Sequence, residues 1–214
     1  GKGYPNPCDY AHIVTSTTHK VFRSARGGII LTNHEDIAKK INTAVFPGYQ
    51  GGPLMHIIAA KAAGFLEALR PDFKDYIKSV LANAKILSET LKNNGFKIYS
   101  GGTDTHLMLV DLRPFNVKGN LAAESLSRAN ITCNKNGIPF DTESPMVTSG
   151  IRLGSQAATT RGFGLKEFEK VGNLIKKTIK GLSENPTDNS KIEDEVRKEV
   201  VELCSKFPIY KHLR

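Results

Sequence analysis

The chain contains 214 residues, of which 39% are hydrophobic and 24% are charged, a balance that allows one large globular domain or two small ones. No stretch approaches the ~18 apolar residues of a transmembrane helix, so no membrane span is predicted. The formal net charge of +9 is compatible with an anionic partner. The lysines are scattered among Glu and Asp, however, and this pattern favours a solvated surface.

The predicted elements begin with two short strands, residues 11–18 and residues 29–32, which are rich in Ile, Val and Thr. The connection between them is too short for a parallel crossover, so the two strands are expected to pair antiparallel. Asn33 is then expected to cap a short helix that has acidic residues in its first turn.

Two helices follow a loop that is dense in turn-forming residues, 46–52. Pro53 suits the first position of a helix that runs to about Leu69. Pro71 begins a long amphipathic helix with apolar residues at helical spacing, and Gly95 is expected to end it.

The remaining pattern alternates between short strands and helices. Strands are predicted at residues 96–99, 106–112, 131–134 and 148–155, and helices at residues 121–129, 165–182 and 191–207. The break near Arg70 divides the chain into an α/β part, residues 1–70, and a small two-layer α+β domain, residues 71–214.

A first candidate site is the segment 15–20, Thr-Ser-Thr-Thr-His-Lys, which ends the first predicted strand. Strand ends in α/β sheets are places where ligands bind, and a lysine there can form a Schiff base with a bound aldehyde. Arg23 and Arg26 add cations suited to a phosphate, and Gly27-Gly28 adds backbone amides. Taken alone the pattern is weak, because a Thr-rich strand and a solvated basic loop would look the same.

Two further segments are candidates. In residues 50–53, Gln-Gly-Gly-Pro, the glycines would let backbone approach a ligand, although a plain turn before a helix is equally compatible. In residues 148–152, Thr-Ser-Gly-Ile-Arg, the planar fork of Arg152 could grip a carboxylate, and Gly150 would leave room beside it. A lone arginine is more often a surface residue.

No metal site is predicted. The six histidines and the three cysteines, Cys8, Cys133 and Cys204, lack metal-ligand spacing, and reduced thiols are expected. His56 lies in an apolar helical stretch and is expected to be a packing residue rather than a ligand.

Taken together, these segments resemble the serine hydroxymethyltransferases. The motifs that carry the resemblance lie in the family's order at residues 15–20, 44–56, 134–139, 148–154 and 157–162. The similarity extends over essentially the whole chain, which resembles the C-terminal half of a longer family pattern. One departure is Ser24-Ala25, where the family usually has Gly-Pro, and this change suggests a looser loop.

The resemblance implies a fold and a cofactor. Residues 1–70 would be the C-terminal part of the large pyridoxal-phosphate domain, aspartate-aminotransferase-like and of fold type I. Lys20 would hold pyridoxal 5'-phosphate covalently, with His19, Thr17 and Arg26 around it. Gly52 would place a backbone amide on the phosphate of a neighbouring subunit's site, which implies a homodimer.

The resemblance also implies the substrates. The family interconverts serine plus tetrahydrofolate with glycine plus 5,10-methylenetetrahydrofolate. Arg152 would hold the amino-acid carboxylate, and the folate would contact Asn136, Ser144, Pro145 and Met146. No nucleic acid or membrane partner is expected. A cytoplasmic location is expected, with an organellar form left open.

Two other functional classes stay open at this point. One is a different pyridoxal-phosphate enzyme of the same fold, such as a threonine aldolase or an aminotransferase. The other is a basic nucleic-acid-binding module, although no aromatic stacking platform accompanies the basic residues. The chain alone is expected to be inactive, because the resemblance places further active-site groups upstream of it.

Overall fold

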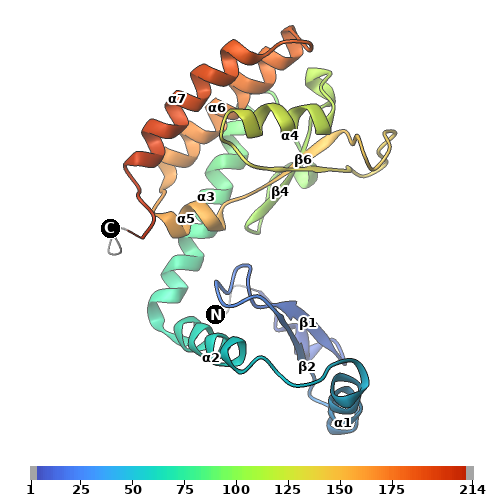
Figure 1. The fold of residues 1–214 in the computed structure, drawn as a ribbon. Coiled ribbons are helices and arrows are strands. Elements are labelled where there is room, and N and C mark those ends of the chain that lie inside the picture. The colour runs from blue at the N-terminus through green and yellow to red at the C-terminus, as the bar shows by residue number, and fades with distance from the viewer. Residues whose placement is uncertain (1–3, 211–214) are drawn as a thin grey trace. The chain divides into compact units, whose positions relative to one another are not determined.

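The computed structural model describes residues 4–210 and gives a mixed α/β protein (Figure 1). The chain forms two compact units that divide between Asp75 and Tyr76, within helix α3 (Pro71–Asn93). In the part of the chain that is described, every helix is too short or too polar to cross a bilayer.

The first unit contains one antiparallel strand pair, β1 (Val14–Thr17) and β2 (Gly28–Leu31), in which Val14 lies opposite Leu31 and Thr17 lies opposite Gly28. The predicted antiparallel pairing is therefore confirmed. Its other elements are a short 3-10 helix, two α-helices and the irregular helical turn between them: η1 (Pro7–Asp9), α1 (Glu35–Thr43), η2 (Ala44–Tyr49) and α2 (Met55–Leu69).

Two predicted helix starts in this unit are wrong. Asn33 is not the cap of α1, since its side chain donates to the Cys8 carbonyl oxygen at 3.1 Å and His34 takes the cap position. Pro53 does not begin α2, because the following Leu54 has extended backbone angles and the helix starts only at Met55.

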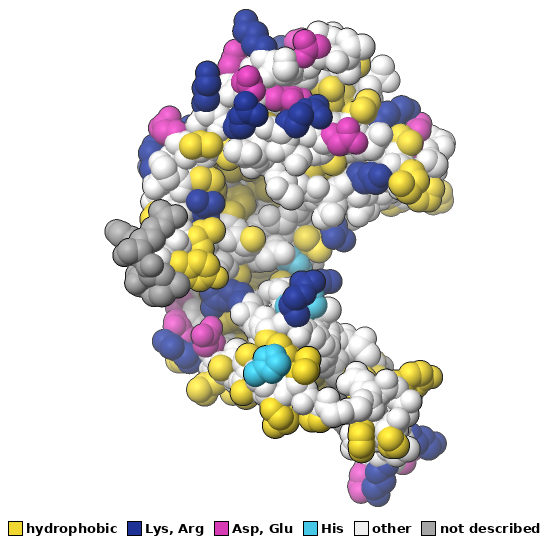
Figure 2. Space-filling view, in the orientation of Figure 1, with side chains coloured by type: hydrophobic (Ala, Val, Ile, Leu, Met, Phe, Trp, Pro, Cys, Tyr) yellow, Lys and Arg dark blue, Asp and Glu magenta, His cyan; other side chains and the backbone are white. Residues whose placement is uncertain are grey.

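The first unit buries little of its apolar surface. Among residues 4–75 only Thr18 and Gly64 are buried, and Figure 2 shows hydrophobic side chains spread over the region of α1 and α2. The large hydrophobic residues exposed on β2, on η2 and on α2 with its cap residue Leu54 are Ile30, Leu31, Phe46, Tyr49, Leu54, Met55, Ile58, Leu66 and Leu69. The packing that stabilises this chain therefore resides mainly in the second unit.

The second unit is built on a four-stranded antiparallel sheet with the order β3-β4-β6-β5. The strands are β3 (Lys97–Ile98), β4 (Leu107–Asp111), β5 (Asn134–Asn136) and β6 (Gly150–Gly154). Its helices, besides most of α3, are α4 (Gly119–Arg128), α5 (Gln156–Arg161), α6 (Leu165–Glu184) and α7 (Ser190–Ser205). Two 3-10 turns, η3 (Tyr99–Gly101) and η4 (Arg113–Phe115), complete it.

Side chains alternate between the two faces of this sheet. Met108, Val110, Ile151 and Leu153 turn to one face and join a buried cluster with apolar residues of α3, α4 and α6. The opposite face carries Arg152, which is exposed. Figure 2 shows acidic and basic side chains interspersed over the region of α6 and α7, as the scattered lysines predict.

Most predicted elements of the second unit are present, with two exceptions. Residues 131–134 were expected to form a strand, but the Ile131 amide donates to the Leu126 carbonyl oxygen at 2.8 Å, after Asn130 has turned the chain with a φ of 63°. Because residues 130–131 terminate α4 in this way, β5 begins only at Asn134. Helix α5 was not predicted, because its six residues are too few to display a helical period.

Candidate functional site

The loop between β1 and β2 is closed at its base by Thr18, which is fully buried. The Thr18 hydroxyl donates to the Ala25 carbonyl oxygen at 2.6 Å and lies 3.2 Å from that of Gly27. The Thr18 carbonyl oxygen accepts from the Ser24 amide at 3.0 Å. Thr17, the candidate named from sequence, is half-buried at the end of β1. Its neighbour Thr18 therefore has the structural role.

Lys20 and His19 lie at the start of this loop. The Lys20 side chain is exposed, and its amine makes no hydrogen bond or ion pair with any residue that the structure describes. The Lys20 carbonyl oxygen accepts from the Arg23 amide at 2.9 Å, which forms a turn. The Gly27 amide donates to Nδ1 of His19 at 3.3 Å, so a neutral His19 ring carries its proton on Nε2. The loop thus orients the imidazole and leaves the amine available.

Helix α2 supports the loop through Ser24. The Ser24 hydroxyl donates to the Ala60 carbonyl oxygen at 3.3 Å, and a β-carbon added at Gly64 would lie only 2.5 Å from the Ser24 Cβ. Ala25 accepts the hydrogen bond from Thr18 described above. Both residues that depart from the family pattern are therefore held by hydrogen bonds, and Gly64 is the residue that permits the contact.

Lys61 of α2 is a second amine at this loop, and sequence reasoning missed it. Its ammonium donates to the Gly28 carbonyl oxygen at 3.1 Å. A β-carbon at Gly27 would meet the Lys61 Cε at 2.5 Å, so a larger residue there would make the end of the lysine side chain move. Its place as the single lysine of a mostly apolar helix was the signal that could have identified it.

The glycine loop before α2 is open. A β-carbon at Gly51 or Gly52 would meet nothing within 4 Å. The start of α2 has no side-chain cap, although the Ile57 amide already donates to the Leu54 carbonyl oxygen at 2.9 Å. Arg26 is exposed and has no side-chain partner within residues 4–210. His56 is also exposed, so the expectation that it packs is wrong.

The second unit presents Arg152 and Asn136 on one face of its sheet. Arg152 on the central strand β6 lies opposite Leu109 of β4 and Asn134 of β5, and Asn136 lies opposite Gly150. Because residues two apart on a strand share a face, Asn136 and Arg152 point to the same side. Among the described residues, no carboxylate pairs with the exposed guanidinium of Arg152.

Gly150 is required by close packing rather than by room for a ligand. A β-carbon there would lie 2.6 Å from a methyl group of Ile138 and 2.7 Å from the Val110 carbonyl oxygen. The glycine therefore lets β6 pass between its neighbours, and Arg152 follows two residues later at a fixed register.

The three remaining candidates lie in the loop of the β5–β6 hairpin, residues 137–149. Ser144, Pro145 and Met146 are all exposed there. Asp141 of the same loop, which sequence reasoning missed, accepts hydrogen bonds from Ile138, Glu143 and Ser149. The structure thus brings the folate candidates and Arg152 onto one hairpin. Lys20, His19, Thr17, Arg26 and Gly52 belong to the other unit.

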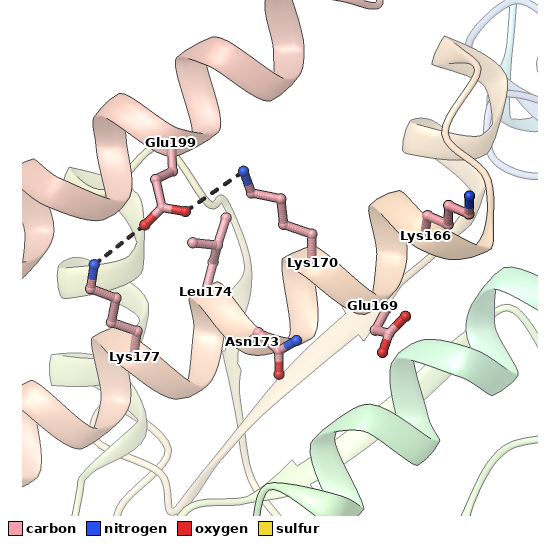
Figure 3. A pocket seen from close by; sticks show the side chains of 7 residues that line it. All are labelled: Lys166, Glu169, Lys170, Asn173, Leu174, Lys177 and Glu199. Carbon is pink, nitrogen blue, oxygen red and sulfur yellow. Dashed lines mark hydrogen bonds and ion pairs between the residues drawn. The ribbon is translucent and has the colours of Figure 1, made fainter.

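A surface pocket of about 360 Å³ lies between α6 and α7 (Figure 3). Glu199 points between Lys170 and Lys177 there and pairs with both, at 3.6 and 3.3 Å. The pocket shares no residue with the candidate segments. Within residues 4–210, no group of three His, Cys, Asp or Glu side chains is arranged to hold a metal ion.

An unpaired lysine amine after a strand and an unpaired arginine on an open sheet face are groups that suit an enzyme for small carboxylate-bearing ligands. The family model for serine hydroxymethyltransferase matches residues 1–175, and the chain belongs to that family. Its mixed α/β composition agrees with the predicted fold type I class.

Curated relatives support the same assignment. The chain is 87% identical, over all its 214 residues, to the serine hydroxymethyltransferase of Pelagibacter ubique (strain HTCC1062), and it covers 49% of that protein. It is 63% identical over 208 residues to the enzyme of Marinomonas sp. (strain MWYL1), with 97% of this chain and 49% of the relative covered. The chain thus spans about half the length of the curated relatives it matches.

Proposed function

We propose that the protein containing this chain is a transferase that interconverts serine plus tetrahydrofolate with glycine plus 5,10-methylenetetrahydrofolate. The observation that carries the proposal is the exposed amine of Lys20 in the loop after β1, which has no partner among the described residues and lies within the range that the family model matches. The relatives, which are serine hydroxymethyltransferases, support the serine and glycine chemistry.

The residues of the lysine loop fit pyridoxal 5'-phosphate. Lys20 would hold the cofactor aldehyde covalently, since its amine has no competing partner in the described part of the chain. Arg26 is an exposed cation, and Gly52 offers an unobstructed backbone to a phosphate. When bound, the cofactor supplies an electron sink for bonds at the substrate α-carbon.

The remaining roles are orientation and charge. His19, with Nδ1 accepting from Gly27, would present its Nε2–H beside the amine, and Thr17 would line the same strand end. Arg152 would bind the amino-acid carboxylate by two parallel hydrogen bonds. The folate would contact Asn136 and residues 144–146 of the β5–β6 hairpin.

Partners and compartment form a further part of the proposal. Gly52 would reach the phosphate at a neighbouring subunit's site, which makes the enzyme a homodimer. The free thiols of Cys8, Cys133 and Cys204 are what a reducing compartment such as the cytoplasm maintains. No nucleic acid or membrane partner is proposed.

Borohydride trapping tests the assignment of Lys20. In the full-length protein loaded with pyridoxal phosphate, reduction followed by peptide mass spectrometry should place the cofactor on Lys20. Lys20→Ala should abolish the borohydride-sensitive visible absorption. Lys39→Ala, which removes an exposed amine paired with Glu35, should retain it. Trapping on another lysine would refute the assignment.

Substrate assays separate this function from the two alternatives. Serine cleavage should depend on tetrahydrofolate, whereas a threonine aldolase or an aminotransferase of the same fold would not need it. Tight nucleic-acid binding with a steep salt dependence would instead favour the basic binding module.

A further inference from the structure

The carboxylate of Asp141 is saturated by four hydrogen bonds from its own loop. One oxygen, Oδ2, accepts from the Ile138 amide at 3.1 Å and from the Ser149 amide at 2.9 Å. The other, Oδ1, accepts from the Glu143 amide at 3.0 Å and from the Ser149 hydroxyl at 2.7 Å. The donors come from both ends and the middle of residues 137–149, so one side chain ties the two ends of the loop to its middle, while the amides of Gly119 and Asn120 hold residues 147–148.

The negative charge of Asp141 is stabilised by uncharged hydrogen-bond donors, which are three backbone amides and one hydroxyl. None of the lysines and arginines that the structure describes forms an ion pair with it. Partial burial acts to raise its pKa, but the hydrogen bonds from the Ser149 hydroxyl and from the amides of Glu143, Ser149 and Ile138 outweigh this and hold the pKa well below the usual range. The carboxylate is therefore ionised and acts only as an acceptor at neutral pH.

The position of the loop gives this arrangement a functional meaning. The paired residues Asn136 and Gly150 close the loop at its base. Residues 144–146 lie between the donors Glu143 and Ser149, and Arg152 follows Ser149 by three residues on β6. The loop segment proposed for folate and the strand proposed for the amino-acid carboxylate are thus both attached to one carboxylate.

We propose that Asp141 is a positioning residue that holds residues 144–146 in place relative to Arg152, whose own position the register of β6 fixes, so that a pterin-bearing co-substrate binds in a defined orientation toward the amino acid. The inference deepens the proposed function and rests on it. Asp141 itself touches neither ligand and acts through the loop it orders.

Asp141→Asn is the sharpest test because it preserves the size of the side chain. The side chain of asparagine has only one acceptor oxygen. If its NH2 group takes the place of Oδ2, this donor faces the backbone amides of Ile138 and Ser149, which are also donors. If the NH2 group takes the place of Oδ1, it faces the Glu143 backbone amide and the Ser149 hydroxyl. Only the hydroxyl can turn from donor to acceptor. Either orientation leaves a backbone amide of the loop without its acceptor.

Asp104→Asn is the matched control, because Asp104 is exposed and the substitution removes the same charge from the same unit. Ser149→Ala is a second variant that removes the hydroxyl donor and leaves the three amide donors in place. It should produce a smaller effect in the same direction.

The variants are made in the full-length protein and compared by steady-state kinetics and by amide hydrogen exchange. Asp141→Asn should raise the KM for tetrahydrofolate about tenfold or more, as expected from losing hydrogen bonds to a charged acceptor. At saturating folate and serine, kcat should fall by a smaller factor. Exchange should increase within residues 137–149 and remain unchanged in α3, α6 and α7. Asp104→Asn should match the wild type in every measurement.

Several outcomes overturn the inference. Unchanged loop exchange and an unchanged KM would show that the carboxylate does not position the loop. Exchange increased throughout the second unit, with KM and kcat affected equally, would show a purely structural role. A separate measurement tests the proposed function itself. If the wild-type protein does not bind 5-formyltetrahydrofolate, folate binding is refuted, whatever the hydrogen exchange of the loop shows.

Discussion

The side chain of Ser24 lies directly against the α-carbon of Gly64, where the lysine loop meets helix α2. A β-carbon at Gly64 would lie 2.3 Å from the Ser24 hydroxyl oxygen and 3.2 Å from the Ser24 Cα. The second of these atoms belongs to the backbone, which cannot turn away as a flexible side chain would. The position of Lys20 therefore depends on a glycine more than forty residues later in the chain.

Gly64→Ala in the full-length protein should displace the lysine loop and weaken the binding of pyridoxal phosphate. Overpacking of this kind costs about 1–3 kcal/mol, which corresponds to roughly a fivefold to hundredfold loss of affinity. Absorbance titration with the cofactor measures the effect. Adding Ser24→Gly should recover most of the affinity, because it removes the side-chain part of the clash. Gly102→Ala is the control, since nothing lies within 4 Å of a β-carbon there. Wild-type affinity in Gly64→Ala would contradict the prediction.

Arg152→Ala in the full-length protein should weaken serine and glycine binding by about 2–5 kcal/mol, the usual loss when a desolvated charge pair loses one partner. Arg152→Lys should recover little of the lost affinity, because an ammonium cannot form the two parallel hydrogen bonds that a planar guanidinium donates to a carboxylate. Equilibrium titration with glycine measures both variants. Arg197→Ala is a suitable control, since Arg197 is an exposed arginine of α7 whose partner is Asp194. Near-normal affinity in both Arg152 variants would exclude it as the carboxylate site.

The 214-residue chain alone should show unequal hydrogen-exchange protection and no useful serine cleavage. Only Thr18 and Gly64 are buried in residues 4–75, whereas the second unit contains a continuous hydrophobic core. Amides of β1, β2 and α2 should therefore exchange faster than those of α3, β4 and α6. Turnover comparable to the full-length enzyme, after addition of pyridoxal phosphate and tetrahydrofolate, would show that this stretch holds a complete active site.

The second unit should lose stability in acid through three carboxylates. Burial acts to raise the pKa values of Asp111 and Asp141, but hydrogen bonds outweigh it and lower both pKa values, from Arg113 for Asp111 and from the loop for Asp141. For Glu193, the hydrogen bond from Arg128 lowers the pKa despite burial. A group with a lowered native pKa stabilises the fold above its unfolded pKa, and the stabilisation disappears as pH falls through the native value.

Stability should therefore be nearly constant from neutral pH to about 5 and should fall below about 4, the unfolded carboxyl range. Urea unfolding of the chain, followed by circular dichroism from pH 7 to pH 3, measures the profile. Glu193→Gln should reduce the steepness of the acid limb. A stability that rises on acidification would contradict these assignments.

Local patterns were sufficient to predict much of the fold. The short connection between β1 and β2 dictated antiparallel pairing, and the period of α3 together with Gly95, which has a φ of 88°, marked the end of that helix. The misplaced elements depend on contacts that a local pattern does not contain. Asn33 is drawn away from its capping position by the Cys8 carbonyl, twenty-five residues earlier.

The same distinction applies to the candidate site. Lys20 and Arg152 could be proposed from sequence because each stands within a segment that resembles a family motif, and their roles stay predictions. Ser24, Lys61 and Asp141 gain their roles from partners that only folding brings together, such as the Gly28 carbonyl for Lys61. For Asp141 a local clue existed, since its bond to the Glu143 amide spans only two residues.

The way Asp141 is held also separates two parts of the second unit by their response to ionic strength. Lys177 pairs with Glu195 and Glu199 in partly exposed ion pairs between α6 and α7, which added salt screens. Asp141 of the β5–β6 loop has no such pair among the described residues, because amide and hydroxyl groups at hydrogen-bond distance stabilise its charge, whereas Glu143 of the same loop pairs with Lys118. Rising salt should therefore weaken the α6–α7 pairs and the Lys118–Glu143 pair before it disturbs the hydrogen bonds that Asp141 accepts.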